Sequence, residues 1–415
     1  MFALIDCNNF YASCERVFNP KLKNKAICVL SNNDGCVIAR SNEAKKMGIK
    51  MGQPAFQLKE LVRTKQLTLL SSNFTLYGDM SDRVMQTLRD FGFDMEIYSI
   101  DEAFLHLPFP EFEAEKVAEE IRSRILKWTG IPVSVGVANT KTLAKLANRI
   151  AKKGAGTFVL TDNTDEILAK TPLTDIWGIG KRCALRLSKS SVLTAKAFIE
   201  KEDLWIRKKL GVTGLKTALE LRGTPSFSLE DAPEPKKSIL CSRSFKDPIL
   251  DLKTLEERLS KYTANALIKL RKQKMHAASI SIFIATSPFE ESTYYANSCT
   301  ITLPLPSDYT PKFLDLMKKG LARIFKESKR YKRAGVILAD FSSIKGLQTD
   351  LFSSVEKDPR KKEAMRMLDK INAKYDKEAL FFAAEGLSKN FRKSHSTPKY
   401  TTSWNDLIRV QSNLH

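Results

Sequence analysis

The sequence predicts an α+β protein of several domains, and three observations support this prediction. A chain of 415 residues is too long for one hydrophobic core, so two to four domains are expected. Short apolar runs with strand-like alternation are interleaved with segments of helical periodicity, which is typical of helices packed on a sheet. A charged, proline-containing stretch at residues 230–237 then suits an extended tether to a second mixed region.

The first region is expected to alternate strands with helices. A strand at 2–6 precedes a helix at 9–17, and a hairpin at 26–40 turns at Asn32-Asn33-Asp34-Gly35. The other expected elements are helices at 42–47 and 76–91, a strand pair at 95–106, a helix at 113–128, a strand at 132–137 and a helix at 140–152. Together they predict an α+β unit with an antiparallel sheet.

Helical patterning resumes at 174–197 and is interrupted by Trp177-Gly178-Ile179-Gly180-Lys181. Because glycine has no side chain, a turn of this kind between two helices lets backbone N–H groups approach a phosphate closely. Such helix-hairpin-helix turns grip a DNA backbone without reading its sequence. From these residues alone, an ordinary turn between helices is at least as good an interpretation.

The second region predicts a β-α-β-β-α-β unit. Its expected elements are a strand at 239–245, a helix at 254–272, strands at 277–286 and 296–302, a helix at 311–327 and a strand at 333–341. The tail continues with Gln348-Thr349-Asp350-Leu351-Phe352 and a helix-like stretch at 359–374. A short peptide of this type can insert Leu351 and Phe352 into an apolar pocket while Gln348 hydrogen-bonds at its rim.

The charge of the chain points to a polyanionic partner. The formal net charge is +21, and residues 236–345 alone carry 21 basic and 10 acidic side chains. A surplus of this size favours nucleic acid through the release of counterions. A merely solvated surface would mix both signs more evenly, so we expect the second region to bind nucleic acid.

Composition also excludes several classes of protein. Seven cysteines without a Cys-x-x-Cys pair argue against a zinc ribbon and against a disulfide framework, and four histidines leave oxygen atoms as the candidate metal ligands. No apolar run approaches the length of a membrane span, and no basic segment followed by an apolar stretch indicates a secretory signal. We therefore expect a soluble, cytoplasmic protein without a membrane partner.

Two acid-bearing segments stand almost a hundred residues apart: Phe2-Ala3-Leu4-Ile5-Asp6, and a second that runs from Tyr98 to Phe104 and contains Asp101-Glu102. Each has the pattern of a short apolar strand, where carboxylates are rare unless something pairs with them. Three hard oxygen donors on adjacent strands would form a Mg²⁺ site suited to phosphoryl transfer. Alternatively, Asp6 caps a helix that starts near Asn8, and Asp101-Glu102 closes a solvated turn.

These segments, in this order, resemble the Y-family of DNA polymerases, the enzymes that copy damaged templates, and within it the UmuC group. The resemblance covers essentially the whole chain and includes residues 9–15, 30–40, 140–148, 177–180 and 241–245. It implies a right-hand polymerase with a palm (1–10 and 76–165), fingers (11–75), a helical thumb with the helix-hairpin-helix turn (166–230), a linker (231–238), a little finger (239–345), a clamp-binding peptide (346–354) and a UmuC-type C-terminal region (355–415).

The resemblance also implies roles for single residues. Asp6, Asp101, Glu102 and the backbone carbonyl of Cys7 would bind two Mg²⁺ ions. The backbone N–H groups of Phe10 and Tyr11, at the start of a helix, would meet the triphosphate of a deoxynucleotide. Arg40, Lys45 and Lys152 would supply positive charge, although Lys45 stands where the family usually has arginine, and a solvated lysine is the alternative for Lys152.

Tyr11 corresponds to the steric gate, which leaves no room for a ribose 2′-hydroxyl, whereas Phe10 fits a core aromatic better. The expected DNA-backbone contacts are Gly178, Gly180, Lys181 and Arg243. The expected clamp-binding residues are Gln348, Leu351 and Phe352.

The function implied is error-prone, DNA-directed DNA synthesis across lesions in the SOS response, without proofreading. The implied partners are a DNA primer-template, a sliding clamp, a dimer of processed UmuD and RecA. Two alternatives are a two-metal nuclease and a non-catalytic DNA-binding repair protein. A nuclease has no use for a steric gate, and clustered carboxylates without a metal would repel one another.

Overall fold

The computed structural model describes residues 1–230, 236–289, 294–343, 359–375, 379–387 and 394–407. The chain divides into two compact units, which are treated separately. Unit 1 comprises Met1–Pro233 with Lys393–His415, and unit 2 comprises Glu234–Arg392. Within the described residues, no helix has the length and apolar character needed to cross a bilayer. All seven cysteines are free thiols, as expected from their spacing.

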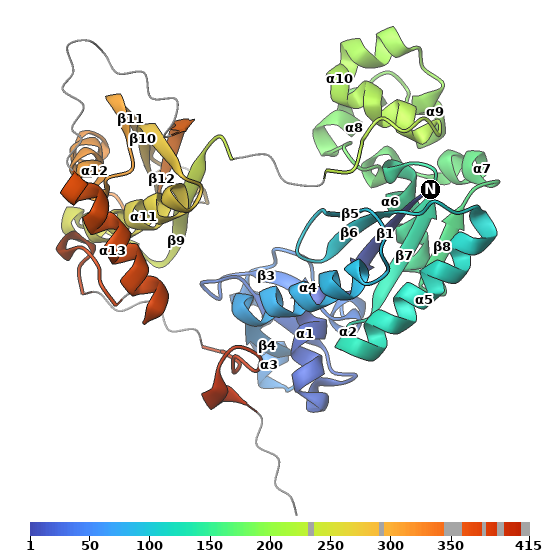
Figure 1. Cartoon of the computed structure of the whole chain (residues 1–415), viewed down its shortest axis with the longest axis horizontal. Coiled ribbons are helices and arrows are strands. Elements are labelled where there is room, and N and C mark those ends of the chain that lie inside the picture. Colours follow the sequence, from blue (N-terminus) through green and yellow to red (C-terminus); the bar gives the residue numbers. More distant parts are fainter. Residues whose placement is uncertain (231–235, 290–293, 344–358, 376–378, 388–393, 408–415) are drawn as a thin grey trace, which may run out of the picture. The chain divides into compact units, whose positions relative to one another are not determined.

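Unit 1 is built around a five-stranded sheet with the order β5-β6-β1-β7-β8. Its strands are β1 (Phe2–Cys7), β5 (Met95–Ile97), β6 (Glu102–His106), β7 (Val133–Ala138) and β8 (Thr157–Leu160). Figure 1 shows β1 between β6 and β7, and both neighbours run antiparallel to it. The prediction of a wholly antiparallel sheet is wrong at the edge, because β8 pairs parallel to β7. The chain between these strands contains a helix, which is the crossover that a parallel pair requires.

Three long helices belong to this sheet, and the sequence predicted all three. They are α4 (Phe74–Arg89), α5 (Glu111–Thr129) and α6 (Lys141–Ala151). Helices α5 and α6 both pack on β7, all six residues of which are buried. A Cβ atom at Gly136 would lie 2.0 Å from the backbone nitrogen of Asn148, so glycine is what lets α6 approach the strand so closely.

A three-stranded sheet with the order β3-β2-β4 forms the second part of unit 1. The predicted hairpin is present as β2 (Ile27–Leu30) and β3 (Val37–Arg40), and β4 (Thr68–Ser71), which was not predicted, pairs parallel to β2. The helices α1 (Phe10–Phe18), α2 (Asn42–Lys46) and α3 (Lys59–Arg63) accompany it. Helix α1 places its buried residues against the same core as β1 and α4.

A helical part completes unit 1, in agreement with the helical patterning at 174–197 and with the thumb implied by the resemblance. It contains α7 (Thr164–Lys170), α8 (Lys181–Ser188), α9 (Ala195–Ile199) and α10 (Asp203–Leu221). Helix α10 is interrupted at Gly211, whose φ of 73° is readily adopted only by glycine.

Unit 2 has the predicted β-α-β-β-α-β order. Its elements are β9 (Ile239–Ile249), α11 (Leu252–Lys272), β10 (Met275–Ala285), β11 (Ala296–Ser307), α12 (Thr310–Ile324) and β12 (Tyr331–Ser343). The four strands form an antiparallel sheet with the order β11-β10-β12-β9. Along β10, Ile280, Ile282 and Ile284 are buried beneath the two helices, while the residues between them face away.

The predicted tail helix is also present, as α13 (Pro359–Lys374). It is attached to α11 by Arg271, whose guanidinium donates to both carboxylate oxygens of Asp369, at 2.6 and 2.8 Å. Such a two-pronged ion pair fixes the helix in position and orientation. The predicted clamp-binding residues Gln348, Leu351 and Phe352 lie outside the described residues.

Candidate active site

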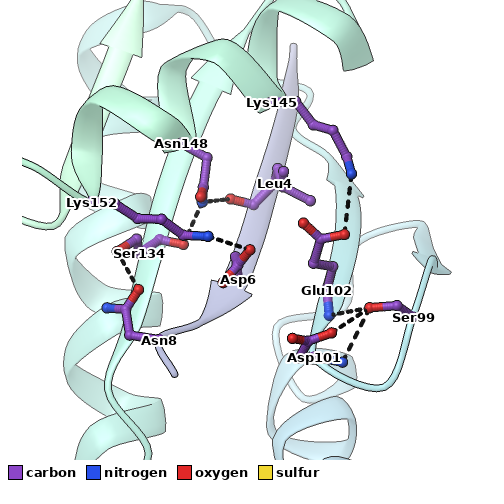
Figure 2. A network of polar contacts seen from close by, with 10 residues as sticks. All are labelled: Leu4, Asp6, Asn8, Ser99, Asp101, Glu102, Ser134, Lys145, Asn148 and Lys152. Atoms are coloured by element: carbon purple, nitrogen blue, oxygen red, sulfur yellow. Dashed lines mark hydrogen bonds and ion pairs between the residues drawn. The ribbon is translucent and has the colours of Figure 1, made fainter. Parts of the chain in front are cut away.

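The two acidic segments are neighbouring strands. The register of β1 and β6 places Asp6 directly opposite Glu102, and the N–H of Cys7 donates to the carbonyl oxygen of Asp101 at 2.9 Å. Figure 2 shows Asp6, Asp101 and Glu102 around one region at the ends of these strands. The prediction that the two acid-bearing segments lie side by side is therefore confirmed for Asp6 and Glu102, while Asp101 lies in the bend just before β6.

The two alternative interpretations, a helix cap for Asp6 and a turn for Asp101-Glu102, have different outcomes. Asp6 belongs to β1 and does not cap a helix, because the residue at the N-cap of α1 is Asn9. Asp101 does lie in the bend between β5 and β6, whereas Glu102 already begins β6. The turn interpretation is thus correct for one of the two residues.

Ser99 fixes the position of Asp101, and the sequence reasoning missed it. Its hydroxyl donates to Asp101 Oδ1 at 2.7 Å and accepts the N–H groups of Asp101 and Glu102 at 3.2 and 3.0 Å (Figure 2). Three hydrogen bonds to one side chain leave the bend little freedom. Serine two residues before an acid in a hairpin turn is the only signal for this role in the sequence.

Helix α6 brings two lysines to the acids. The ammonium of Lys152 lies 2.5 Å from Asp6 Oδ2, and that of Lys145 lies 3.1 Å from Glu102 Oε2 (Figure 2). Between them, Asn148 donates to the carbonyls of Leu4 and Ser134 at 3.0 and 2.7 Å, which attaches the helix to β1 and β7. Lys145 was not predicted, but the spacing of residues 145, 148 and 152 along one helix face could have revealed it.

Burial dominates the electrostatics of Asp6. The residue is only 8% exposed, and this burial raises the pKa of the carboxyl to about 7, against the opposing effect of Lys152. The nearby carboxylate of Glu102 raises it further. A buried carboxylate next to another carboxylate is stabilised by a cation, and the lysine ammonium groups occupy that position here.

The donor set fits Mg²⁺ by its chemistry. Within the described residues, no three side chains of histidine, cysteine, aspartate or glutamate gather into a ready-made metal cluster. However, Asp6, Asp101 and Glu102 offer only hard carboxylate oxygens, and two of the three already attract a cation. Cys7 offers no thiolate, because burial raises the pKa of its thiol well above the usual value.

Tyr11 lies at the start of α1 beside this site. Its ring stacks on Tyr77 of α4 with centroids 4.4 Å apart, and it meets Phe74 edge-on at 6.0 Å. Burial raises the pKa of the Tyr11 hydroxyl, and the charge of Asp101 adds to the increase. Phe10 is 3% exposed and belongs to the core, as its alternative interpretation predicted.

Of the three predicted cations, Lys152 forms an ion pair with one of the acids, Asp6. Burial lowers the pKa of Lys45, the charges of Arg40 and Lys152 lower it further, and Asp6 opposes them. Arg40 donates from Nη1 to the carbonyl of Ile49 at 2.6 Å, and its buried Nε has no hydrogen-bond partner within the described residues. The mutual repulsion of Arg40, Lys45 and Lys152 would be reduced by a bound anion.

The predicted glycine turn precedes α8. Gly178 has a φ of 86°, and Gly180 is the N-cap residue of the helix that Lys181 begins. The preceding element is a short 3₁₀-helix, Leu173–Asp175. Gly178 also lines a cavity of 760 Å³, which includes Tyr98 and Trp177 but none of the three acids.

Arg243 lies on the edge strand β9 and is exposed. It is opposite Ala334, whose side chain is buried beneath the helices, so Arg243 projects from the helix-covered side of the sheet. Its charge acts on Tyr262 of α11. The opposite, uncovered face carries Arg333, whose guanidinium lies 5.6 Å from the ring of Phe283.

Comparisons with known proteins agree with this arrangement. Family models match residues 5–149 (impB/mucB/samB family), 236–351 (its C-terminal domain) and 362–410 (a domain of unknown function, DUF4113). UmuC of Salmonella typhimurium is 41% identical over 99% of this chain and 100% of its own length. The chain belongs to the impB/mucB/samB family. MucB of Escherichia coli is 37% identical over 98% of the chain and 99% of its own length.

More distant relatives of this family member extend the comparison. DNA polymerase IV 1 of Bacillus subtilis is 26% identical over 89% of each chain. A chimera of Y-family DNA polymerases matches the structure with a TM-score of 0.67 at 23% identity, covering 83% of this chain and 100% of the chimera. An insertion ternary complex of Dbh DNA polymerase matches with a TM-score of 0.52 at 23% identity, over 83% of this chain and 100% of that one. The fold is thus the multidomain α+β fold of Y-family polymerases, with palm, fingers, thumb and little finger.

Proposed function

We propose that this protein is an error-prone, DNA-directed DNA polymerase that carries out translesion synthesis by two-metal nucleotidyl transfer. One observation carries the proposal: Asp6 and Glu102 face each other on neighbouring strands, with Asp101 beside them and the cations Lys45 and Lys152 nearby. The fold and the relatives named UmuC and DNA polymerase IV support the same activity.

In this proposal, Asp6, Asp101, Glu102 and the Cys7 carbonyl hold two Mg²⁺ ions. Bound there, the ions would lower the pKa of the primer 3′-hydroxyl and neutralise charge on the triphosphate. The chain itself supplies the remaining charge. Arg40, Lys45 and Lys152 bind the triphosphate, together with the backbone N–H groups at the start of α1.

Tyr11 acts as the steric gate for the sugar. Its ring is held by stacking on Tyr77 and by the edge of Phe74, so it cannot easily swing away from a 2′-hydroxyl. A rigid aromatic ring discriminates by shape, without any hydrogen bond to the sugar. The replacement of Tyr11 by alanine is expected to admit ribonucleotides.

The remaining assignments follow the boundaries expected from the sequence. The palm (1–10 and 76–165) carries the chemistry, the fingers (11–75) cover the nucleotide, and the thumb (166–230) and little finger (239–345) bind primer-template DNA. Gly178, Gly180, Lys181 and Arg243 contact the DNA backbone. Gln348, Leu351 and Phe352 bind a sliding clamp. A dimer of processed UmuD assists synthesis in the SOS response, as does RecA. The protein works in the cytoplasm without proofreading.

Primer extension on a damaged template tests the proposal, with Mg²⁺ and deoxynucleotides present and with or without the clamp and the UmuD-like partner. We expect Asp101→Ala to lower the extension rate by about 100-fold to 1000-fold, the range for removing one group that stabilises transition-state charge. Binding of the primer-template should persist. Asp94→Ala is the matched control, because Asp94 is an exposed aspartate just before the same hairpin.

Two results would contradict the proposal. Extension by Asp101→Ala at the rate of the unsubstituted protein would remove the metal-site assignment. Degradation of the primer by the unsubstituted protein, with no extension when deoxynucleotides are present, would favour the nuclease.

A further inference from the structure

The end of the chain contributes a segment to unit 1. Residues 394–407 lie inside the range matched by the domain of unknown function, whereas α13, which opens that range, belongs to unit 2. His395 pairs with the end of β4: its carbonyl accepts the N–H of Ser71 at 2.9 Å, and its own N–H donates to the Ser71 hydroxyl at 3.1 Å. The segment is therefore bound to the sheet that carries Arg40.

Helix α1 presents one stripe of side chains to this segment. Tyr11, Glu15 and Phe18 are spaced by four and three residues, so they share one face of the helix. Tyr11 stacks on Tyr77, and Phe18 stacks on Tyr400 with centroids 4.9 Å apart and an angle of 7° between the rings. The stripe begins at the proposed sugar gate and ends at the C-terminal segment.

Glu15 joins the two ends of the stripe. Its carboxylate oxygen Oε1 accepts the hydroxyl of Tyr77 at 2.7 Å and the hydroxyl of Thr397 at 3.2 Å. The side chain of Glu15 is buried, at 1% exposure, so these donors replace the water that a free carboxylate would bind. Loss of either donor would leave a buried carboxylate poorly satisfied.

Asn73 holds Thr397 from the other side. Its side-chain nitrogen donates to Thr397 Oγ1 at 3.0 Å and to the Pro398 carbonyl at 2.9 Å. Its side-chain oxygen accepts the N–H of Leu76 and so caps α4, the helix that carries Tyr77. One amide thus connects the start of α4 with the same threonine that contacts Glu15.

We propose that residues 394–407 stabilise the steric gate, Tyr11. Within this segment, Thr397 is a positioning residue, and it acts on Tyr11 through Glu15 and Tyr77. The hydroxyl of Thr397 fixes the Glu15 carboxylate, which fixes the Tyr77 hydroxyl, and the Tyr77 ring holds the Tyr11 ring by stacking. Part of the domain of unknown function then sets how strictly deoxyribose is preferred over ribose. The inference rests on the proposed function, in which Tyr11 is the gate.

The test compares three single substitutions in the full chain. Thr397→Val replaces the hydroxyl by a methyl group, and Thr397→Ser retains it. Thr401→Val is the matched control, because the buried hydroxyl of Thr401 has no hydrogen-bond partner within the described residues. The measurement is kcat/KM for a deoxynucleotide divided by kcat/KM for the corresponding ribonucleotide.

We expect Thr397→Val to lower this ratio by about tenfold, the effect of losing one hydrogen bond to a charged group. Thr397→Ser and Thr401→Val should leave the ratio unchanged. In a chain that already carries Tyr11→Ala, the change Thr397→Val should have no further effect, because the two residues act in series. An equal loss with Thr401→Val, or an undiminished effect of Thr397→Val in the Tyr11→Ala chain, would overturn the inference.

Failure of the proposed function would be recognised separately. If Tyr11→Ala by itself leaves sugar discrimination unchanged, the gate assignment falls, and this inference falls with it. The physical link can be measured without catalysis, from the fluorine NMR signal of a fluorotyrosine placed at position 11. That signal should shift with Thr397→Val and not with Thr401→Val, and an unchanged signal in both would overturn the coupling itself.

Discussion

The two units of this protein differ in whether they bury ionisable side chains. In unit 1, ionisable side chains are buried: Asp6, Glu15, Glu96, Lys141 and Glu220. Across the described residues of unit 2, the buried polar side chains are all hydroxyls: Ser260, Thr263, Ser279, Thr286 and Thr310. In the five-stranded sheet β7 is buried at every residue, while β10 of the four-stranded sheet largely alternates buried and half-buried positions.

Buried charged side chains require ion-pair or hydrogen-bond partners, and unit 1 provides them. Glu96 pairs with Lys141, and Glu220 accepts the N–H groups of Thr142, Ser226 and Phe227 at 3.0, 2.6 and 3.0 Å. Such networks fix side chains in defined positions, which chemistry needs. Exposed cations on a sheet instead suit contacts with a phosphate backbone that do not depend on sequence, which is the role proposed for unit 2.

The largest expected effect is on stability, and it compares a glycine-to-alanine substitution in each of the two sheets. At Gly136, a new methyl group would meet backbone atoms of α6, 2.0 Å from Asn148 N and 2.6 Å from Ala144 O. At Gly335 it would meet side chains, Ser242 Cβ at 2.4 Å and Phe283 Cζ at 2.5 Å. The Phe283 ring can rotate and Ser242 Cβ can shift with the edge strand β9, whereas α6 is packed against the central strands. We therefore expect Gly136→Ala to lower the free energy of unfolding by about 3 kcal/mol and Gly335→Ala by about 2 kcal/mol.

Denaturant unfolding of the two variants, followed by signals specific to each unit, measures this difference. The lysine contacts of Asp6 and Glu102 depend on α6, so Gly136→Ala should also slow primer extension. Equal losses of stability in the two variants would mean that an added methyl group costs the same in the five-stranded sheet as in the four-stranded sheet.

A smaller effect is expected for cations of the four-stranded sheet. Arg243 and Arg333 project from opposite sides of this sheet, and both are exposed. If each neutralises one DNA phosphate, Arg243→Ala and Arg333→Ala should each reduce the slope of log binding constant against log salt by about 0.9. Lys319→Ala, an exposed lysine on α12, is the control. A loss of slope for only one arginine would identify the side of the sheet that faces DNA.

The smallest effect expected concerns the pH dependence of stability at Glu15. Burial raises the pKa of Glu15 above 4.5, against the hydrogen bonds from Tyr77 and Thr397. The unfolded chain therefore releases this proton more readily than the folded chain, and stability falls as pH rises above about 4.5. Glu15→Gln lacks this ionisation, so its stability relative to the unsubstituted protein should increase over that pH range by on the order of 1 kcal/mol.

Glu43→Gln provides a control of opposite sign. Burial raises the pKa of Glu43, but hydrogen bonds from Ser41 and Arg16 outweigh it, and the net shift is downward. The ionised Glu43 thus stabilises the fold above pH 4.5. Glu43→Gln should therefore be less stable than the unsubstituted protein there, and this difference in the free energy of unfolding should shrink as the pH falls below 4.5. Unfolding midpoints measured from pH 3 to 8 would distinguish the two glutamates, and parallel curves would contradict both assignments.

Periodicity predicted most of this architecture because most elements are long enough to display it. The strand ending at Asp6, the strand pair at 95–106 and all six elements of the β-α-β-β-α-β unit are present, although the segment from Tyr98 was expected to be strand and β6 begins only at Glu102. The strands β4 and β8 were missed, because each has only four residues and its parallel pairing depends on distant parts of the chain.

Site residues could be predicted where residue type and spacing along the sequence indicate them. Those that depend on tertiary contacts could not. Carboxylates in apolar strands indicated Asp6 and Glu102 before any geometry was known. The pairing of Lys145 with Glu102 depends on how closely α6 approaches β7 across Gly136. No local pattern connects Thr397 with Glu15, because the contact joins residues 382 positions apart.

That separation has a consequence for synthesis of the protein on the ribosome. At 5 to 20 residues per second, about 20 to 80 s pass between translation of Glu15 and translation of Thr397. Through that interval the nascent N-terminal part folds with this carboxylate lacking one hydroxyl donor and with Phe18 not yet covered by Tyr400. A nascent chain arrested before residue 394 should accordingly be more sensitive to protease near α1 than the finished protein.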